Sequence, residues 1–260
     1  MAQRGSRSQP AVEKLSTVAP LADAVVIGAG PNGLVAANVL ASAGWRVVVL
    51  EAQQTPGGAV RSGELTGQPG FTHDLFSSFY PLGVAGPAMR SMELERHGLR
   101  WRRSPLAVAH PTLDGSSIAI SQDIDETAES FDRFAPGDGD RWRELYGLWE
   151  RIGDDVIDAL LGGPFPPVLA SGRLAAALRR DVLRFVRFGL LPARRMAEEW
   201  FEGDGAARML AGNALHADFT PEAAGSGIYG WLLASLAQQH GWPVPEGGSG
   251  ELTAALVRRL

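Results

Sequence analysis

Near the N-terminus, short apolar runs alternate with glycine-rich or polar breaks. The run at 24–27 has the length and β-branched content of a buried strand, and it stops at the glycine-rich segment 28–33. Residues 32–43 are rich in Ala, Leu and Val and are followed by a glycine, which predicts a helix. The run at 46–50 predicts a second strand that ends in Glu51. The order strand, turn, helix, strand predicts a Rossmann-like βαβ unit.

Further along, the spacing of the apolar positions becomes helical. Residues 87–98 predict a short helix, and 107–121 predict a hairpin that turns at Asp114 and Gly115 and forms a small meander beside the sheet. A helix begins after Asp123, which suits the N-cap position. The other helices are predicted at 139–161, 169–191, 193–202, 204–215 and 221–239. The predicted fold class is α/β, with an incomplete Rossmann-like sheet and a largely helical second region.

The turn after the first strand reads Gly-Ala-Gly-Pro-Asn-Gly, a GxGxxG pattern between a strand and a helix. Gly28 permits the tight turn, Gly30 leaves out the Cβ that would block a pyrophosphate, and Gly33 lets helix and strand pack closely. Pro31 suits the first helical turn, where the free N–H groups at Asn32 and its neighbours face the phosphates with the positive end of the helix dipole. The pattern predicts a dinucleotide-binding site.

The acidic residue after the second strand sets the preference for the ribose. Glu51 lies 18 residues beyond Gly33, and Ala52 adjoins it in the predicted site. The carboxylate can accept hydrogen bonds from both hydroxyls of an adenosine ribose, whereas it repels a 2′-phosphate. Glycines also mark ordinary turns, but strand, turn, helix, strand and acid stand here in register. The spacing therefore favours a dinucleotide without a 2′-phosphate.

A second glycine pair, Gly57 and Gly58, follows six residues after Glu51. A simple nicotinamide-binding unit has no need of such a pair. At this point the sequence resembles the flavoprotein superfamily of amine oxidases and phytoene desaturases, whose members follow the ribose-binding Glu with a Gly-Gly-Arg motif on the pyrophosphate. The resemblance implies FAD as the cofactor. Ala59 stands where amine oxidases usually have Arg, so that contact is absent, and Arg61 is the nearby substitute.

The resemblance continues over residues 69–81, which in phytoene desaturase-like enzymes return the chain to the flavin. Asp74, Ser77 and Ser78 stand at matching positions. This variant is most similar to bacterial phytoene desaturase-like proteins related to pyridine nucleotide-disulfide oxidoreductase domain-containing proteins, and the similarity returns at 215–260. In that family the helical insertion is a substrate-binding cap. The resemblance implies an oxidoreductase that transfers a hydride from a small hydrophobic substrate to the flavin.

On this basis we expect four parts in the chain. They are a tail at 1–20, an FAD-binding part at 21–122, a helical substrate or cap region at 123–243 and a return to the FAD domain at 244–260. In the resembled family, the pair represented by Gly247 and Gly248 precedes a helix that leads back into the dinucleotide domain. The sequence is therefore expected to be the N-terminal half of a longer enzyme, with an unpaired apolar sheet edge and doubtful activity alone.

Two other functions stay open from the sequence. One is a non-catalytic remnant or subunit that completes its sheet with a partner chain carrying the C-terminal half. The other is an NAD-dependent dehydrogenase, which the pair Gly57 and Gly58 disfavours. The catalytic residues are not specified, and His73 is the one histidine in the predicted flavin segment. No metal site is expected, because the histidines lack ligand spacing.

Composition narrows the chemistry further. The 260 residues include no cysteine, which excludes disulfides, thiolate metal sites, iron–sulfur clusters and cysteinyl flavin links. The net charge of −5 argues against general affinity for nucleic acid. Residues 1–20 lack the apolar core of a secretory signal, and no apolar run is long enough to cross a bilayer. We expect a cytoplasmic protein.

One stretch departs from the acidic balance. Residues 173–195 contain seven arginines and a single acid, Asp181, together with apolar residues at helical spacing. A basic amphipathic helix of this kind can lie on a membrane surface and collect a lipid-soluble substrate. The alternative, which we favour, is a solvated helix face packed on the cap.

Overall fold

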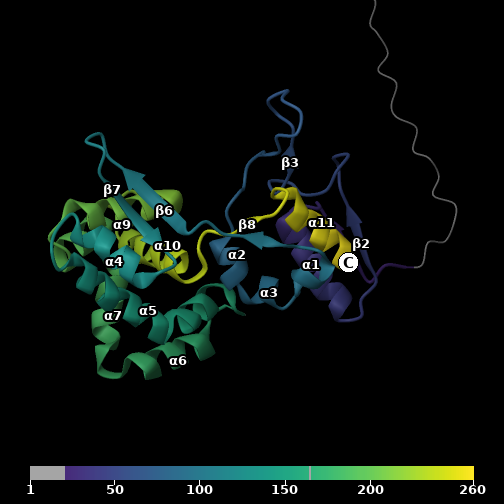
Figure 1. Cartoon of the computed structure of the whole chain (residues 1–260). Coiled ribbons are helices and arrows are strands. Elements are labelled where there is room, and N and C mark those ends of the chain that lie inside the picture. Colours follow the sequence, from purple (N-terminus) through teal and green to yellow (C-terminus); the bar gives the residue numbers. More distant parts are fainter. Residues whose placement is uncertain (1–20, 164) are drawn as a thin grey trace, which may run out of the picture.

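The computed structural model describes residues 21–163 and 165–260, so the predicted tail at 1–20 lies outside the described residues. The chain forms two lobes joined by a narrow crossing (Figure 1). One lobe holds the first strands and both terminal helices, and the other holds most of the helices. Each lobe has its own cluster of buried apolar residues.

The first lobe contains the predicted βαβ unit. Strands β1 (Ala24–Ile27) and β2 (Val47–Leu50) are parallel, with Ala24 opposite Val47 and Ile27 opposite Leu50, and helix α1 (Pro31–Ser42) connects them. The predicted strands and helix are confirmed to within one residue at each end. Within the described ranges this sheet has two strands, as expected for an incomplete Rossmann-like unit.

Helix α11 (Gly250–Arg259) returns from the far end of the chain and packs against α1. The buried Asn38 of α1 ties the two together, because its Nδ2 donates to the Leu34 carbonyl at 2.9 Å and to the Leu256 carbonyl at 3.0 Å. Arg259 adds a hydrogen bond from Nη1 to the Asn38 side-chain oxygen at 3.0 Å. Helix α11 thus lies in the same lobe as α1.

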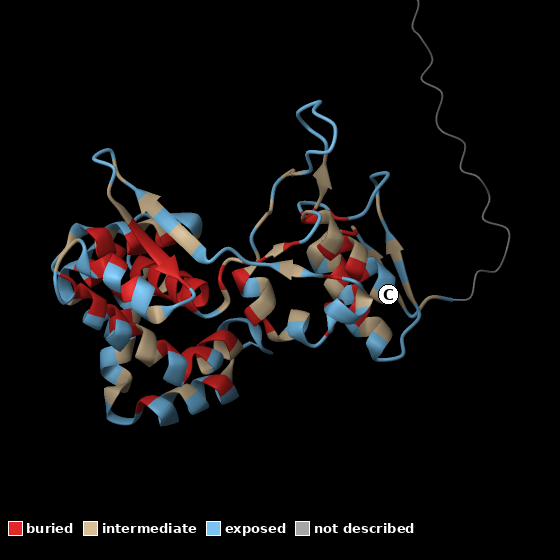
Figure 2. Ribbon diagram, viewed as in Figure 1, coloured by how far each residue is buried: buried red, intermediate tan, exposed pale blue. Residues whose placement is uncertain are grey.

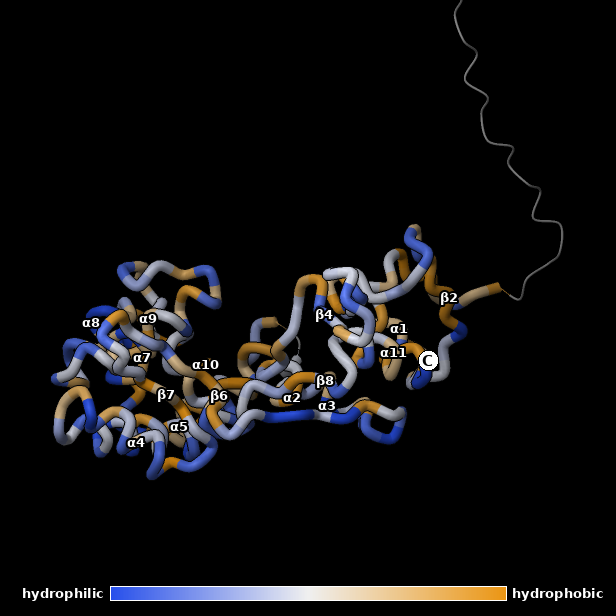
Figure 3. The backbone as a smooth tube through the Cα atoms, turned by 45° about the horizontal axis from the view of Figure 1, so that its top comes forward, coloured by the Kyte–Doolittle hydropathy of each residue, from blue (hydrophilic) through white to orange (hydrophobic). Residues whose placement is uncertain are grey.

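The sheet is covered on one face only. Alternate residues point away from α1, and Val25 and Ile27 are 56% and 87% exposed. Val48 and Leu50 of β2 lie on the same open face, and Figures 2 and 3 show β2 as an apolar strand without a fully buried residue. The prediction of a buried first strand is thus wrong for this face, since no described element packs on it.

A two-stranded antiparallel pair, β3 (Ser62–Gly63) and β4 (His73–Asp74), follows the nucleotide segment. Two short helices come next, α2 (Pro81–Ala85) and α3 (Pro87–Arg90), and then the 3₁₀ turn η1 (Leu94–His97). The predicted continuous helix over 87–98 is therefore wrong. It breaks at Glu93, whose φ of +46° cannot continue a right-handed helix.

The crossing between the lobes consists of two short antiparallel strands. β5 (Trp101–Arg102) pairs with β8 (Val244–Pro245), so the outgoing and returning chain segments are hydrogen-bonded to each other (Figure 1).

The hairpin of β6 (Leu106–Pro111) and β7 (Ser117–Ser121) forms as predicted, with its turn at Asp114 and Gly115. It does not lie beside the parallel sheet, however. Ile118 and Ile120 are fully buried in the cluster of the helical lobe, where β7 packs on three of the helices. The expected meander beside the sheet is therefore wrong, because the apolar face of the hairpin finds its cover among the helices.

The helical lobe otherwise follows the predicted elements. Its helices are α4 (Ile124–Asp132), α5 (Asp138–Leu161), α6 (Val168–Leu178), α7 (Val182–Leu190), α8 (Ala193–Trp200), α9 (Asp204–His216) and α10 (Ser226–His240). The predicted helix over 169–191 is broken by the 3₁₀ turn η2 (Arg179–Asp181), and the last predicted helix starts at Ser226 rather than 221. Among the described helices, none combines the length and apolarity needed to span a bilayer.

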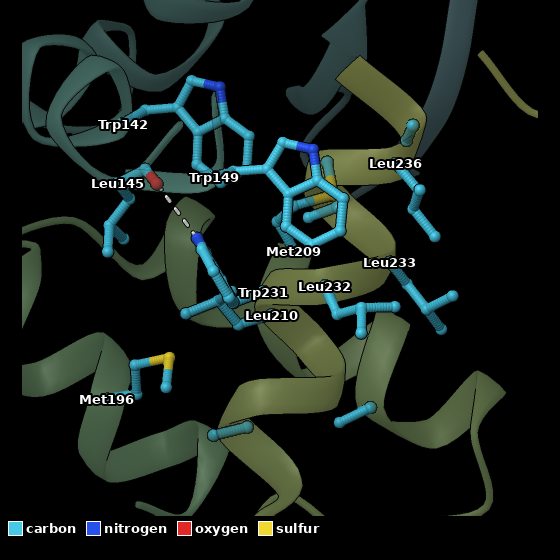
Figure 4. Packing of buried hydrophobic residues seen from close by; sticks show 14 of the residues in the cluster. Trp142, Leu145, Trp149, Met196, Met209, Leu210, Trp231, Leu232, Leu233 and Leu236 are labelled. Atoms are coloured by element: carbon cyan, nitrogen blue, oxygen red, sulfur yellow. Dashed lines mark hydrogen bonds between the residues drawn. The ribbon is translucent and has the colours of Figure 1, made fainter. Parts of the chain in front are cut away.

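Tryptophans form the centre of this lobe. Trp231 of α10 is fully buried and donates its Nε1 hydrogen to the Leu145 carbonyl of α5 at 3.1 Å (Figure 4). Trp149 stands edge-on to it, with ring centroids 5.4 Å apart. Trp231 is thus a core residue, and its buried N–H keeps a hydrogen-bond partner as a buried indole requires.

Candidate dinucleotide-binding site

The predicted turn lies at the carboxyl ends of the two parallel strands. The Gly28 amide donates to the Leu50 carbonyl at 2.7 Å, so the residues that follow β1 and β2 are adjacent. Gly28 has a φ of +94°, a conformation that strongly favours glycine. The chain can therefore turn sharply here and start α1 with its N-terminus at the strand ends.

The start of α1 presents free amides. The first helical hydrogen bond runs from the Leu34 amide to the Gly30 carbonyl at 2.9 Å. The amides of Gly30, Asn32 and Gly33 donate to no partner within the part of the chain that the structure describes. Gly30 is the N-cap without a side-chain hydrogen bond, and Pro31 occupies the first helical position as predicted. Free amides and the positive end of the dipole suit an anion.

Gly33 and Gly30 differ in how much space the fold leaves for a side chain. A Cβ at Gly33 would lie 2.0 Å from the Gly28 carbonyl oxygen, so the packing of helix against strand excludes any side chain there. A Cβ at Gly30 would meet only the Gly58 Cα, at 3.9 Å. The fold leaves room for a side chain at Gly30, and the glycine keeps that room open.

The second glycine pair lies against the first glycine motif. The Gly57 amide donates to the Ala29 carbonyl at 2.7 Å. A Cβ at Gly58 would stand 3.1 Å from the Gly30 Cα, which is too close for comfortable packing. The structure therefore brings Gly28, Gly30, Gly57 and Gly58 together in one backbone cradle.

Glu51 holds the edge of this cradle. One carboxylate oxygen accepts from the Ala29 amide at 2.7 Å and the other accepts from the Gln53 amide at 2.9 Å. These two hydrogen bonds, from Gln53 and from Ala29, hold the pKa of Glu51 below its ordinary value. One amide of the turn is thus taken by the protein, while each carboxylate oxygen keeps an acceptor lone pair. Ala52 follows as an exposed residue at the end of β2.

Arg61 and the serine segment close the other side. The Arg61 Nε donates to the Gly58 carbonyl at 2.8 Å, and its charge lowers the pKa of Glu51 further. The Ser77 amide donates to the Ala59 carbonyl at 3.2 Å, so the segment over 69–81 returns to the second glycine pair.

Asp74 binds the protein's own backbone. Its Oδ1 accepts from the Ser62 hydroxyl at 2.8 Å and from the Ser249 amide at 2.6 Å, at the N-terminus of α11. Partial burial acts to raise the pKa of Asp74, but hydrogen bonds from Ser249, Ser62 and Ser78 outweigh it and the pKa lies below its ordinary value. Asp74 therefore anchors α11, and Ser78 contributes to that anchor.

Sequence reasoning missed the serine and threonine partners of this anchor. The Gly250 amide donates to the Ser62 hydroxyl at 2.8 Å, and the Thr253 hydroxyl donates to the Val60 carbonyl at 2.7 Å. The only signal was a serine just after Gly248, at the start of a predicted helix. His73, in contrast, lies in the β3–β4 pair with its Nε2 3.2 Å from the Thr66 hydroxyl.

Comparison with known proteins extends the picture beyond the turn. The family described as NAD(P)-binding Rossmann-like domain matches residues 26–92. The chain is 28% identical to pyridine nucleotide-disulfide oxidoreductase domain-containing protein 2 of Rattus norvegicus, over 92% of this chain and 45% of the relative. It is 32% identical to hydroxyneurosporene desaturase of Rhodobacter capsulatus, over 91% of this chain and 47% of the relative. Both alignments run through the two lobes.

These similarities fit the amine oxidase and phytoene desaturase superfamily. Cyclohexylamine oxidase from Brevibacterium oxydans shares the superfamily fold with a TM-score of 0.54 at 19% identity, over 92% of this chain and 49% of the oxidase. The chain spans less than half the length of each of these superfamily members.

Proposed function

We propose that the chain binds FAD and is part of a flavin-dependent oxidoreductase that takes a hydride from a hydrophobic substrate. The observation that carries this proposal is the second glycine pair, which lies against the first with the Gly57 amide 2.7 Å from the Ala29 carbonyl. A simple nicotinamide-binding unit needs only the first motif. The superfamily supports the flavin as the dinucleotide.

The fit of the site to FAD follows from its polar groups. The free amides of Gly30, Asn32 and Gly33 would hold the pyrophosphate, and the open space at Gly30 would let it approach the backbone. Glu51 would accept the ribose hydroxyls through its remaining lone pairs, and Arg61 would lie beside the phosphates. Bound FAD supplies a hydride acceptor, whereas the protein supplies position and electrostatics.

The names of two relatives support the substrate class. Hydroxyneurosporene desaturase and cyclohexylamine oxidase are named for substrates with a large hydrocarbon part. In the resembled family the helical insertion is the substrate cap, and on the proposed function the helical lobe of this chain would hold the hydrophobic substrate.

The first experiment is a titration of the purified chain with FAD, followed by flavin absorption and by quenching of flavin fluorescence. We expect one FAD per chain and weaker binding of NAD. NADP should bind worst, because the ionised Glu51 repels a 2′-phosphate. Tight NAD binding without FAD binding would instead establish the nicotinamide-dependent dehydrogenase.

A pair of variants tests the cradle itself. Gly30→Ala should fold normally, since its Cβ meets only Gly58 at 3.9 Å, yet it should weaken FAD binding about tenfold or more by occupying the space for the pyrophosphate. Gly147→Ala on α5 is the matched control, because nothing lies within 4 Å of its added Cβ. Equal FAD affinity in both variants would contradict the proposed placement of the pyrophosphate.

The open sheet face favours a second proposal, in which a partner polypeptide supplies strands that flank β1. Val25, Ile27, Val48 and Leu50 are 44–87% exposed on this face, although strand residues of this kind are usually covered in a parallel sheet. Co-expression with polypeptides that resemble the remaining part of the superfamily members tests this. Co-purification that Ile27→Asp abolishes supports it, and a monomer with full FAD-dependent turnover contradicts it.

A further inference from the structure

A concave pocket lies in the helical lobe, away from the lobe that contains the glycine-rich turn. It has a volume of about 630 Å³ and opens to solvent between α5, η2 and α7, with Trp200 of α8 at its edge. This volume falls in the range of small-molecule sites. Nothing in the proposed flavin site uses it.

The charged residues that line this pocket are four arginines and one aspartate. The arginines are Arg151, Arg179, Arg180 and Arg184, and the aspartate is Asp181. Arg184 pairs with Asp181 at 3.2 Å, and Arg151 donates to the Gly147 carbonyl at 3.2 Å. Arg179 and Arg180 take part in no ion pair between described residues. The pocket therefore keeps a positive charge that the protein does not neutralise.

The other arginines of the basic segment 173–195 differ in this respect. Arg173 pairs with Asp155 at 2.7 Å, Arg187 with Glu199 at 2.6 Å and Arg194 with Glu222 at 2.6 Å. Arg195 also pairs, with Glu198 and Glu199. The charge counted along the sequence is thus largely balanced in the fold, and what remains is gathered at the pocket.

The floor of the pocket is apolar and aromatic. Phe188 of α7 is buried, with its ring 6.0 Å from that of Phe185 and 6.3 Å from that of Trp200. Ile152 and Leu178 complete this floor. A ligand that fills the pocket would therefore meet cations at the mouth and hydrocarbon below.

Arg179 holds an unusual backbone conformation at this mouth. Its φ is +51° and its ψ is −118°, at the break between α6 and η2. A long side chain at positive φ is strained, and such strain persists where it serves a function or is fixed by its surroundings. Glycine would relieve the strain, but it would remove the guanidinium from the pocket.

We propose that this pocket binds the phosphate of a phosphate ester that carries an apolar chain. Guanidinium groups match phosphate oxygens in a bidentate geometry, and Arg179 and Arg180 are free to do so. The aromatic floor would take the first carbons of the chain. The phosphate can come from a soluble alkyl or prenyl phosphate or from a phospholipid head group.

Calorimetric titration of the full chain with n-octyl phosphate tests the shared chemistry. We expect binding to weaken as the salt concentration rises from 50 to 500 mM, because salt screens the attraction between the exposed guanidinium groups and the phosphate. Inorganic phosphate carries only the charged group of this ligand, and octanol carries only its apolar chain. Each should bind at least tenfold more weakly than octyl phosphate. Equal binding of octanol and octyl phosphate would overturn the proposal.

Two arginine variants distinguish binding in this pocket from a nonspecific effect of the protein's positive charge. Arg180→Ala should weaken octyl phosphate binding about tenfold, which is the usual loss for one charged hydrogen bond. Arg133→Ala removes another exposed arginine of the same lobe, outside this pocket, and should change nothing.

Arg179→Gly should weaken octyl phosphate binding while raising the melting temperature, because the strain at positive φ disappears. Glu93→Gly relieves the same kind of strain at φ +46°, far from the pocket, and should leave binding intact. Unchanged affinity in both Arg179→Gly and Arg180→Ala would overturn the assignment of the site.

Co-sedimentation distinguishes the two sources of phosphate. Vesicles of phosphatidylcholine with phosphatidic acid should sediment the protein if the phosphate belongs to a lipid, and Arg180→Ala should then reduce the bound fraction. Binding of octyl phosphate without vesicle binding assigns the site to a soluble ester. Vesicle binding that is insensitive to both pocket variants would place membrane contact elsewhere and count against this pocket.

Discussion

At the scale of single residues, neighbouring groups of one motif serve different needs. Gly33 is required by packing, because its Cβ would lie 2.0 Å from the Gly28 carbonyl oxygen, whereas a Cβ at Gly30 would meet only the Gly58 Cα, at 3.9 Å. Asp74 likewise differs from its neighbours, since it caps the start of α11 through the Ser249 amide at 2.6 Å. Residues that look equivalent in a motif can thus be separated by what each one touches.

The steric demand at Gly33 predicts a loss of stability. We expect Gly33→Ala to destabilise the chain by about 1–3 kcal/mol, because the helix must shift away from the strand to admit the methyl group. Urea unfolding followed by circular dichroism measures this. Gly30→Ala is the comparison, and a similar loss in both variants would show that packing, not the ligand, requires Gly30.

Asp74 predicts a pH dependence. Its pKa in the folded chain lies below the ordinary value of 3.8, so its contribution to stability is present above that pH and is lost as the pH falls through the lower folded value. Asp74→Asn should cost about 1 kcal/mol at neutral pH. The difference from wild type should shrink below pH 3.8.

Urea midpoints at pH 7 and at acidic pH check this expectation. Asp154→Asn on the exposed side of α5 serves as the control. A difference between Asp74→Asn and wild type that stays constant with pH would contradict the role of the ionised carboxylate.

At the scale of elements, local sequence signals predicted some helix boundaries correctly and missed others. Asp123 caps α4 as predicted, with its Oδ1 accepting from the Asp125 amide at 2.8 Å. The helix predicted over 169–191 breaks at Arg179, where no glycine or proline marks the break. Capping residues act on their own next few amides, which makes a start such as that of α4 readable from the sequence.

The cap of α4 gives a prediction at this scale. Asp123→Ala should destabilise the helical lobe by about 1 kcal/mol, because the first-turn amides of α4 lose their acceptor. Asp123→Ser keeps an acceptor at the same place and should retain most of the stability. Urea unfolding followed by tryptophan fluorescence reports this lobe through Trp231, and equal losses in the two variants would exclude the cap as the cause.

At the scale of the whole molecule, the two lobes differ in how completely their apolar residues are covered. The helical lobe has the larger buried apolar cluster, with Ile120 of the hairpin fully buried. The dinucleotide lobe buries α1 and α11 against each other but leaves one face of its sheet open, with Ile27 87% exposed. The first lobe is therefore the one that leaves a face of its sheet exposed as apolar surface.

This contrast predicts unequal costs for the same substitution. Ile120→Thr should cost several kcal/mol, because a buried hydroxyl replaces a packed ethyl group, whereas Ile27→Thr should cost less than about 0.5 kcal/mol and raise solubility. Urea midpoints and sedimentation velocity measure both effects. A large loss from Ile27→Thr in the purified chain would show that its sheet face is covered in solution.

The sequence by itself determined the nucleotide-binding unit, because each of its signals is local. The apolar run of β1, the glycine turn, the helix after Pro31 and the strand that ends in Glu51 depend on neighbours within a few residues. The superfamily could be named from the second glycine pair for the same reason.

Only the tertiary structure decided what lies against these elements. The hairpin of β6 and β7 packs in the helical lobe, and Asp74 caps α11 from 175 residues away in sequence. Three arginines of the segment 173–195 pair with acids outside that segment: Arg173, Arg187 and Arg194. Hydrogen bonds and ion pairs between distant segments depend on how the chain packs. Pattern and spacing do not encode that packing.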